Sequence, residues 1–263
     1  MVYVPSRIRR FCMCGQAYRF SSSQERIIIK RRIELMSIKI EQDTLTFLAE
    51  LAEHNTREWF GEHKARYDKA RKNYISFLDE LLLEMQHFEP AARGQQGKEL
   101  VFRIYRDVRF SNDKRPYKDH FGAYIAEGGR KSILPGYYLH LAGNNNSFLA
   151  GGLWYPPAEQ LKAVRQEIDY SLEEFKGIVE SEAFVKRFGG IQGDQLKTTP
   201  KGYDKENPAI HYLRFKGWNG VMPLPDETVL RPDFMQVVLD GFQALKPLND
   251  FLMAPLLDVG GDE

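Results

Sequence analysis

The chain has 263 residues, of which 43% are hydrophobic and 13% aromatic, so a globular protein with a buried core is expected. No apolar run approaches the roughly 20 residues of a membrane-spanning helix. The two cysteines, Cys12 and Cys14, are too few for a disulfide framework. Both features favour a soluble cytoplasmic protein without a membrane partner. Residues 1–35 carry eight Lys/Arg against two acids and the rest 29 against 34, which argues against generic adhesion to nucleic acid, so any anion site must be local.

Residues 1–35 are basic, contain a serine run and show no sustained hydrophobic period. Helical periodicity begins just after Met36. We interpret residues 1–35 as a disordered N-terminal extension upstream of the true start at Met36. An organellar transit peptide is the alternative, since arginine and serine enrichment with few acids is typical of such peptides. Cys12 and Cys14 make a poor metal site without further cysteines or a nearby histidine.

Two helices are predicted before residue 90. Asp43 can cap the first, whose apolar positions recur between residues 45 and 52. Apolar and aromatic residues then recur every three or four positions from Trp59 to Phe88, and Pro90 ends the pattern. This stripe predicts one continuous helix that packs on a sheet, in preference to a cofactor site.

Four strands are predicted in the middle of the chain. Residues 99–110 alternate with a period of two, and residues 120–127, 133–142 and 147–154 give three further strands. The sequence GNNN at residues 143–146 favours a hairpin, because glycine and asparagine tolerate positive φ. These strands predict a largely antiparallel sheet, while residues 217–225 fit either a short strand or a loop.

Helices follow the sheet. Two prolines at 156–157 open a helical region that can break near Ser171 and ends at two glycines, residues 189–190. Asn207 and Pro208 favour a short helix, and residues 231–256 a helix pair divided at Pro247. This order predicts an α+β fold, a mainly antiparallel sheet packed with N- and C-terminal helices in a single domain of residues 36–263. The chain has neither βαβ alternation nor a GxGxxG or P-loop motif, which argues against a nucleotide-binding α/β fold.

The segment FRIYRDVRFSNDKRPYKDHFGAYI, residues 102–125, concentrates six cations, three acids, three tyrosines and one histidine. On the predicted strand, Arg106 interrupts an apolar face and must find a partner, because an unpaired buried charge is costly. The opposite face carries Arg103, Tyr105, Asp107 and Arg109. Two arginines and a tyrosine in a row can grip a multi-oxygen anion such as phosphate, because the planar guanidinium offers two parallel donors.

The loop after this predicted strand adds Lys114, Lys118 and the hydroxyl of Tyr117, and its backbone amides can form an anion nest. Three aspartates sit among the same cations, so a structural network of ion pairs is the alternative. The segment alone leaves the ligand site and the structural network both open.

This segment resembles the hallmark stretch of an uncharacterised family, the domain of unknown function numbered 2461, which carries an RxYRDxRFSxDKxPYKxxFGA-like motif. The likeness continues through GYYLHLAGNNNSFLAGGLWYPP and LKTTPKGYDKENPAIHYLRFKGW, and covers roughly Asp43 to Leu256 but not residues 1–35. No activity is established for this family, so the resemblance implies no reaction. It does imply that polar residues of the three segments share a site.

The candidate ligand-binding residues come from these three segments: Arg103, Tyr105, Arg106, Arg109, Lys114, Tyr117, Lys118, Trp154, Lys201 and Arg214. Asp107 and His120 are the candidate catalytic residues, and His120 can act as an acid or base near a bound anion. His140 is expected between strands or in the core. The spacing of the histidines supports no metal site, and no cofactor is predicted.

We therefore predict a cleft for a phosphate-bearing or other anionic small molecule. Hydrolase or transferase activity stays open, because no nucleophile signature is present. A nucleic-acid-associated protein, whose cations follow the backbone while tyrosines stack on bases, is one alternative. A non-enzymatic protein-interaction module with a structural ion-pair network is the other. The sequence leaves the oligomeric state open.

Overall fold

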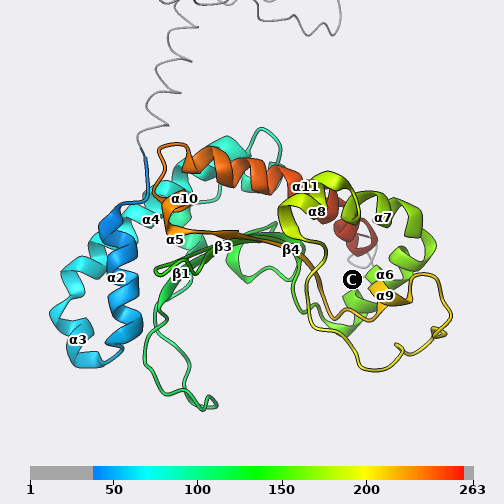
Figure 1. Ribbon diagram of the computed structural model, residues 1–263, viewed down its shortest axis with the longest axis horizontal. Coiled ribbons are helices and arrows are strands. Elements are labelled where there is room, and N and C mark those ends of the chain that lie inside the picture. The colour runs from blue at the N-terminus through cyan, green and yellow to red at the C-terminus, as the bar shows by residue number, and fades with distance from the viewer. Residues whose placement is uncertain (1–37, 258–263) are drawn as a thin grey trace, which may run out of the picture. The chain divides into compact units, whose positions relative to one another are not determined.

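Four antiparallel strands form the sheet in the computed structural model, which describes residues 38–257 (Figure 1). They are β1 (His120–Ile125), β2 (Gly136–Ala142), β3 (Ser147–Leu153) and β4 (Trp218–Leu224), and neighbours in the sheet follow the order β1-β2-β3-β4. Asn144 and Asn145 have φ of 59° and 61°, so the predicted GNNN hairpin between β2 and β3 is confirmed. The extension predicted for residues 1–35, with Cys12 and Cys14, lies outside the described residues.

The helices surround this sheet on one side and at its ends. They are α2 (Gln42–Glu53), α3 (Arg57–Glu62), α4 (Lys64–Met85), α5 (Gly97–Leu100), α6 (Ala158–Tyr170), α7 (Leu172–Val179), α8 (Glu182–Phe188), α9 (Ile210–Leu213), α10 (Asp226–Val229) and α11 (Phe234–Leu257), with short 3-10 turns at Pro90–Ala92 and Gly129–Lys131. Residues 154–217, between β3 and β4, hold α6 to α9. The predicted α+β class is confirmed. No helix among residues 38–257 combines the length and apolar character needed to span a membrane.

The strand predicted over residues 99–110 is wrong. Residues 97–100 form α5, and the chain then runs beside β1 in an extended but irregular path, with isolated bridges from Val101 to Ala123 and from Tyr105 to Tyr117. Charged residues that alternate on an exposed edge give a period of two without a continuous ladder. The fourth strand is instead β4, whose single glycine and proline weakened the strand signal.

Two predicted helix boundaries are also wrong. The stripe from Trp59 to Phe88 divides at His63, where the backbone leaves helical geometry after the poor helix former Gly61. Helix α11, in contrast, continues through Pro247 and Pro255. Buried apolar residues lie on both sides of Pro247, so tertiary packing offsets the roughly 3 kcal/mol that an internal proline costs.

Helix α11 packs directly on the sheet (Figure 1). A Cβ added to Gly151 on β3 would lie 2.9 Å from Leu245 of α11, and one on Gly220 of β4 only 2.6 Å from it, so these two glycines allow the close approach. Alternation along β2 sends Tyr137, Leu139 and Leu141 into this core and sends Tyr138 and His140 to the opposite face. We call that opposite side the open face of the sheet.

Candidate functional site

A cavity of about 570 Å³ lies on the open face. Tyr138 and His140 of β2 and Phe148 and Ala150 of β3 form its floor, because strand alternation and register bring them together: Tyr138 faces Ala150 and His140 faces Phe148. The walls include Phe102 and Lys118 from the segment beside β1, Arg130 from the turn after it, and Trp154 after β3. The volume suits a small molecule.

The floor is a row of aromatic rings. The ring of His140 stacks on Phe148 with centroids 4.4 Å apart and on His120 with centroids 4.1 Å apart. The Tyr138 ring extends over Gly122 of β1, the residue paired with His140, where an added Cβ would come within 2.9 Å of the tyrosine Cζ. The absence of a side chain at Gly122 therefore leaves the space that the Tyr138 ring occupies. Because Phe148 and His120 cover both faces of the His140 ring, this stack presents ring edges to the cavity, and an aromatic ligand can pack on them edge to face.

Two cations border the floor. The ammonium of Lys118 lies 5.1 Å and the guanidinium carbon of Arg130 5.9 Å from the centre of the Phe102 ring. Burial lowers the pKa of Lys118, and the charges of Arg103 and Arg130 lower it further. Within residues 38–257 no carboxylate forms an ion pair with Lys118 or Arg130. The cavity thus holds positive charge that an anion would stabilise.

The histidines at the edge of the floor have different partners. Nδ1 of His120 lies 3.0 Å from Oδ1 of Asp119, and the hydrogen bond to His120 is the main reason that the pKa of Asp119 is lowered. Nδ1 of His140 lies 3.1 Å from the hydroxyl oxygen of Tyr138. Burial, followed by the charge of His120, lowers the pKa of His140 to about 3. His140 is therefore a neutral imidazole at physiological pH.

Some of the residues predicted for the site meet at this cavity. Lys118 and Trp154 line it, and Arg103 is close enough for its charge to lower the pKa of Lys118. The predicted catalytic candidate His120 adjoins it through the stacked ring of His140.

Other predicted residues lie in ion pairs outside the cavity. Arg109 bonds to Asp107 through two nitrogens and, with a backbone bond, lowers the pKa of that carboxyl to about 2. Arg106 pairs with Asp113, which also binds Arg115. These contacts are the ones expected from the structural-network alternative for the 106–115 segment.

The remaining candidates are scattered. The ring of Tyr117 is buried and stacks on Phe60, with ring centroids 4.0 Å apart. Tyr105 is 54% exposed, and the ammonium of Lys114 donates to the carbonyl of Val108. Lys201 is exposed, and neither it nor Arg214 lines the cavity. The third segment ends at Trp218, and the cavity is lined instead by Asn219 and Val221 of β4, which follow it.

Sequence reasoning missed the floor of the cavity and Arg130. The GNNN hairpin fixes the β2–β3 register, so it contained the signal that pairs His140 with Phe148 on one face. Arg130 lies in a turn, and only the tertiary structure brings it to Phe102.

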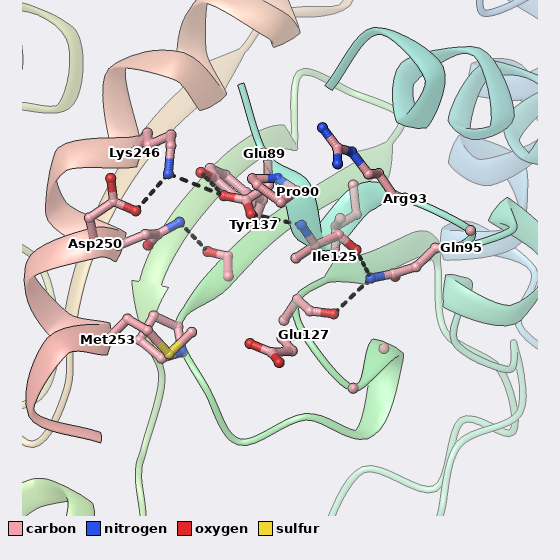
Figure 2. Close-up of a pocket in the computed structure, with 18 of the residues that line it drawn as sticks. Glu89, Pro90, Arg93, Gln95, Ile125, Glu127, Tyr137, Lys246, Asp250 and Met253 are labelled. Atoms are coloured by element: carbon pink, nitrogen blue, oxygen red, sulfur yellow. Dashed lines mark hydrogen bonds and ion pairs between the residues drawn. The ribbon is translucent and has the colours of Figure 1, made fainter. Parts of the chain in front are cut away.

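A second cavity, of about 790 Å³, lies between α11 and the 3-10 turn at Pro90–Ala92 (Figure 2). Three of the charged groups that line it, Glu89, Lys246 and Asp250, lie close enough to pair with one another. The hydroxyl of Tyr137 donates to Glu89 at 2.9 Å, and the ammonium of Lys246 lies 2.6 Å from Asp250 and 3.8 Å from Glu89 (Figure 2). Among the described residues Lys118 of the open-face cavity has no ion pair or side-chain hydrogen bond, and Arg130 has only a hydrogen bond to the carbonyl of Val101, so we take the open-face cavity as the candidate functional site.

A family model described as conserved hypothetical protein (DUF2461) matches residues 43–251. The chain belongs to this family. The predicted resemblance is confirmed, and the DUF2461 match includes the whole sheet and the residues that line the open-face cavity. No curated protein and no solved structure matches the chain.

Proposed function

We propose that the protein binds a small anionic molecule with a planar apolar part in the open-face cavity. The observation that carries this proposal is Lys118, a half-buried ammonium whose neighbouring charges, Arg103 and Arg130, are also cations. Holding like charges together in a partly dehydrated place is unfavourable, and a bound anion relieves it. The ring of Phe102 and the floor of Tyr138 and Phe148 provide the surface for the planar part.

Isothermal titration calorimetry with phenyl phosphate, inorganic phosphate and phenol separates the two halves of this proposal. Phenyl phosphate is expected to bind more tightly than either fragment, because it alone engages both the cations and the rings. Lys118→Gln should weaken its binding about tenfold, the effect of losing roughly 1.4 kcal/mol of charge-assisted hydrogen bonding. The variant should remain folded, since Lys118 makes no side-chain hydrogen bond within residues 38–257.

Arg109→Gln is the matched control, because it removes a cation from the same segment outside the cavity. Its affinity for phenyl phosphate should equal that of the wild type. Binding that is equally strong in Lys118→Gln, or equally weak in both variants, would contradict the proposed site.

Aromatic side chains next to cations are also the combination that binds single-stranded nucleic acid, so such a nucleic acid is the second candidate. A short oligonucleotide included in the titration distinguishes the two. If the nucleic acid is the ligand, its affinity should exceed that of phenyl phosphate and fall steeply as salt concentration rises. The expected cytoplasmic location stays a prediction, which fractionation of cells that express the protein would test.

A further inference from the structure

The two stacked histidines at the edge of the cavity hold their protons in different ways. This inference rests on the proposed function, because it concerns what happens to a ligand held there. Nδ1 of His120 faces the carboxylate of Asp119 at 3.0 Å, and a carboxylate accepts hydrogen bonds. Nδ1 of His120 therefore carries the proton, and in the neutral ring Nε2 has a free lone pair. A carboxylate that orients an imidazole in this way prepares it to act as a base.

His140 has the reverse arrangement. Burial raises the pKa of Tyr138 to about 12, so its hydroxyl keeps its proton and can donate it to Nδ1 of His140, 3.1 Å away. We assign the tyrosine hydroxyl as the donor and Nδ1 as the acceptor of this bond, which places the proton of the neutral His140 ring on Nε2. No other hydrogen bond of the Tyr138 hydroxyl is seen within residues 38–257. His140 is thus a neutral donor that lines the cavity.

A base, a neutral donor and nearby cations are the three parts needed to remove a proton next to a carbonyl group in an anion. His120 does not itself line the cavity, but its side chain is 25% exposed and its ring stacks on that of His140 with centroids 4.1 Å apart, so a ligand that extends from the cavity past His140 can reach both. We propose that the site catalyses proton abstraction from the carbon next to the carbonyl of an anionic, aryl-bearing substrate, with His120 as base and His140 as donor to the carbonyl oxygen. Asp119 acts as a positioning residue for His120.

The step needs no further reactant. The carbon–hydrogen bond breaks, and the proton moves to Nε2 of His120. The electron pair of that bond forms the carbon–carbon double bond of an enolate, while the π pair of the carbonyl group moves onto its oxygen. Nε2–H of His140 donates a hydrogen bond to the enolate oxygen. Return of a proton from the His120 imidazolium to carbon or oxygen completes the cycle and restores the neutral ring.

Phenylpyruvate is a suitable probe, because its ring can pack on the aromatic floor and its carboxylate can approach Lys118. Proton NMR in D2O measures how fast deuterium replaces the hydrogens at the carbon next to its carbonyl, and the rate without protein is subtracted. The wild-type protein should accelerate this exchange. His120→Gln should slow the catalysed exchange by a hundredfold or more, the usual contribution of a general base.

The other variants test each role separately. His140→Phe keeps an aromatic ring in the stack but removes the donor, so phenylpyruvate should bind while exchange is lost. Asp119→Asn should lower kcat and leave KM unchanged, whereas a purely structural role would change both or neither. His87→Gln, which changes an exposed histidine outside the cavity, is the matched control and should exchange at the wild-type rate.

Calorimetry on the same samples keeps the outcomes distinct. Phenylpyruvate that binds to wild type without faster exchange overturns the catalytic inference and leaves the proposed function standing. Binding of phenyl phosphate without binding of phenylpyruvate overturns the substrate class. Failure of every aromatic anion to bind contradicts the proposed function itself. Exchange that stays at the wild-type rate in His120→Gln overturns the assignment of the base.

Discussion

Acidification should destabilise the protein through His140. Its pKa is lowered from 6.5 to about 3 in the folded state, mainly by burial. Between these values the unfolded chain binds a proton that the folded chain does not, so stability falls as pH falls from about 6.5 towards 3. Above the unfolded value neither state binds the proton, and His140 adds no pH dependence.

The size of this effect follows from linkage. For a histidine with these two pKa values, the free energy of unfolding should drop by about 2 kcal/mol between pH 7 and pH 5. This drop in the free energy of unfolding does not depend on the exact folded-state pKa, because any value below about 4 leaves the folded ring almost entirely neutral at pH 5. The charged neighbours that influence the ring, His120, Asp119 and Lys118, remain in place when His140 alone is changed.

Urea unfolding at pH 7 and pH 5, for wild type and His140→Gln, isolates this contribution. Subtracting one pH dependence from the other cancels the groups common to both proteins. The wild type should lose about 2 kcal/mol more than the variant over this interval. His87→Gln removes an exposed imidazole and serves as the control. A wild type and a His140→Gln variant with the same pH dependence would refute the reasoning.

Three further substitutions test other contacts. Gly122→Ala should cost about 2 kcal/mol by overpacking against Tyr138, and should weaken phenyl phosphate binding measured by calorimetry. Asn55→Ala should cost about 3 kcal/mol in urea unfolding, because the Asn55 amide satisfies both the buried backbone N–H and the C=O of Tyr117. Arg109→Ala should leave the unfolding midpoint unchanged, since its ion pair is exposed; a clear loss would show that the pair is structural.

Local chemistry explains which parts of the fold could be predicted. The β2–β3 hairpin was predictable because Asn144 and Asn145 adopt the positive φ that their residue type tolerates. Helix α11 was predicted to break because proline propensity is local, whereas the packing that carries the helix through Pro247 is not. The extended segment beside β1 alternates like a strand, but hydrogen bonds with its neighbour decide whether it joins the sheet.

The candidate site likewise has residues that could be predicted from local sequence and residues that could not. Lys118 was predicted from its residue type in the cationic segment and Trp154 from the second segment of the family resemblance, and both line the cavity. Arg109 looked equivalent to Lys118 in the sequence, yet its position next to Asp107 in space neutralises it. Arg130 could not be predicted as a site residue, because nothing in the sequence around a single arginine in a turn shows that it will lie next to Phe102.

The strand order has a consequence for the order of folding. Short connections join β1, β2 and β3, whereas β4 pairs with β3 only after residues 154–217 have been placed. Closing that long loop has an entropic cost, so we expect the first three strands to associate before β4 is added. During that interval the outer edge of β3 is unpaired and can template pairing with another chain. A chaperone that shields this edge would raise the yield of native protein, and substitutions on β4 should mainly accelerate unfolding.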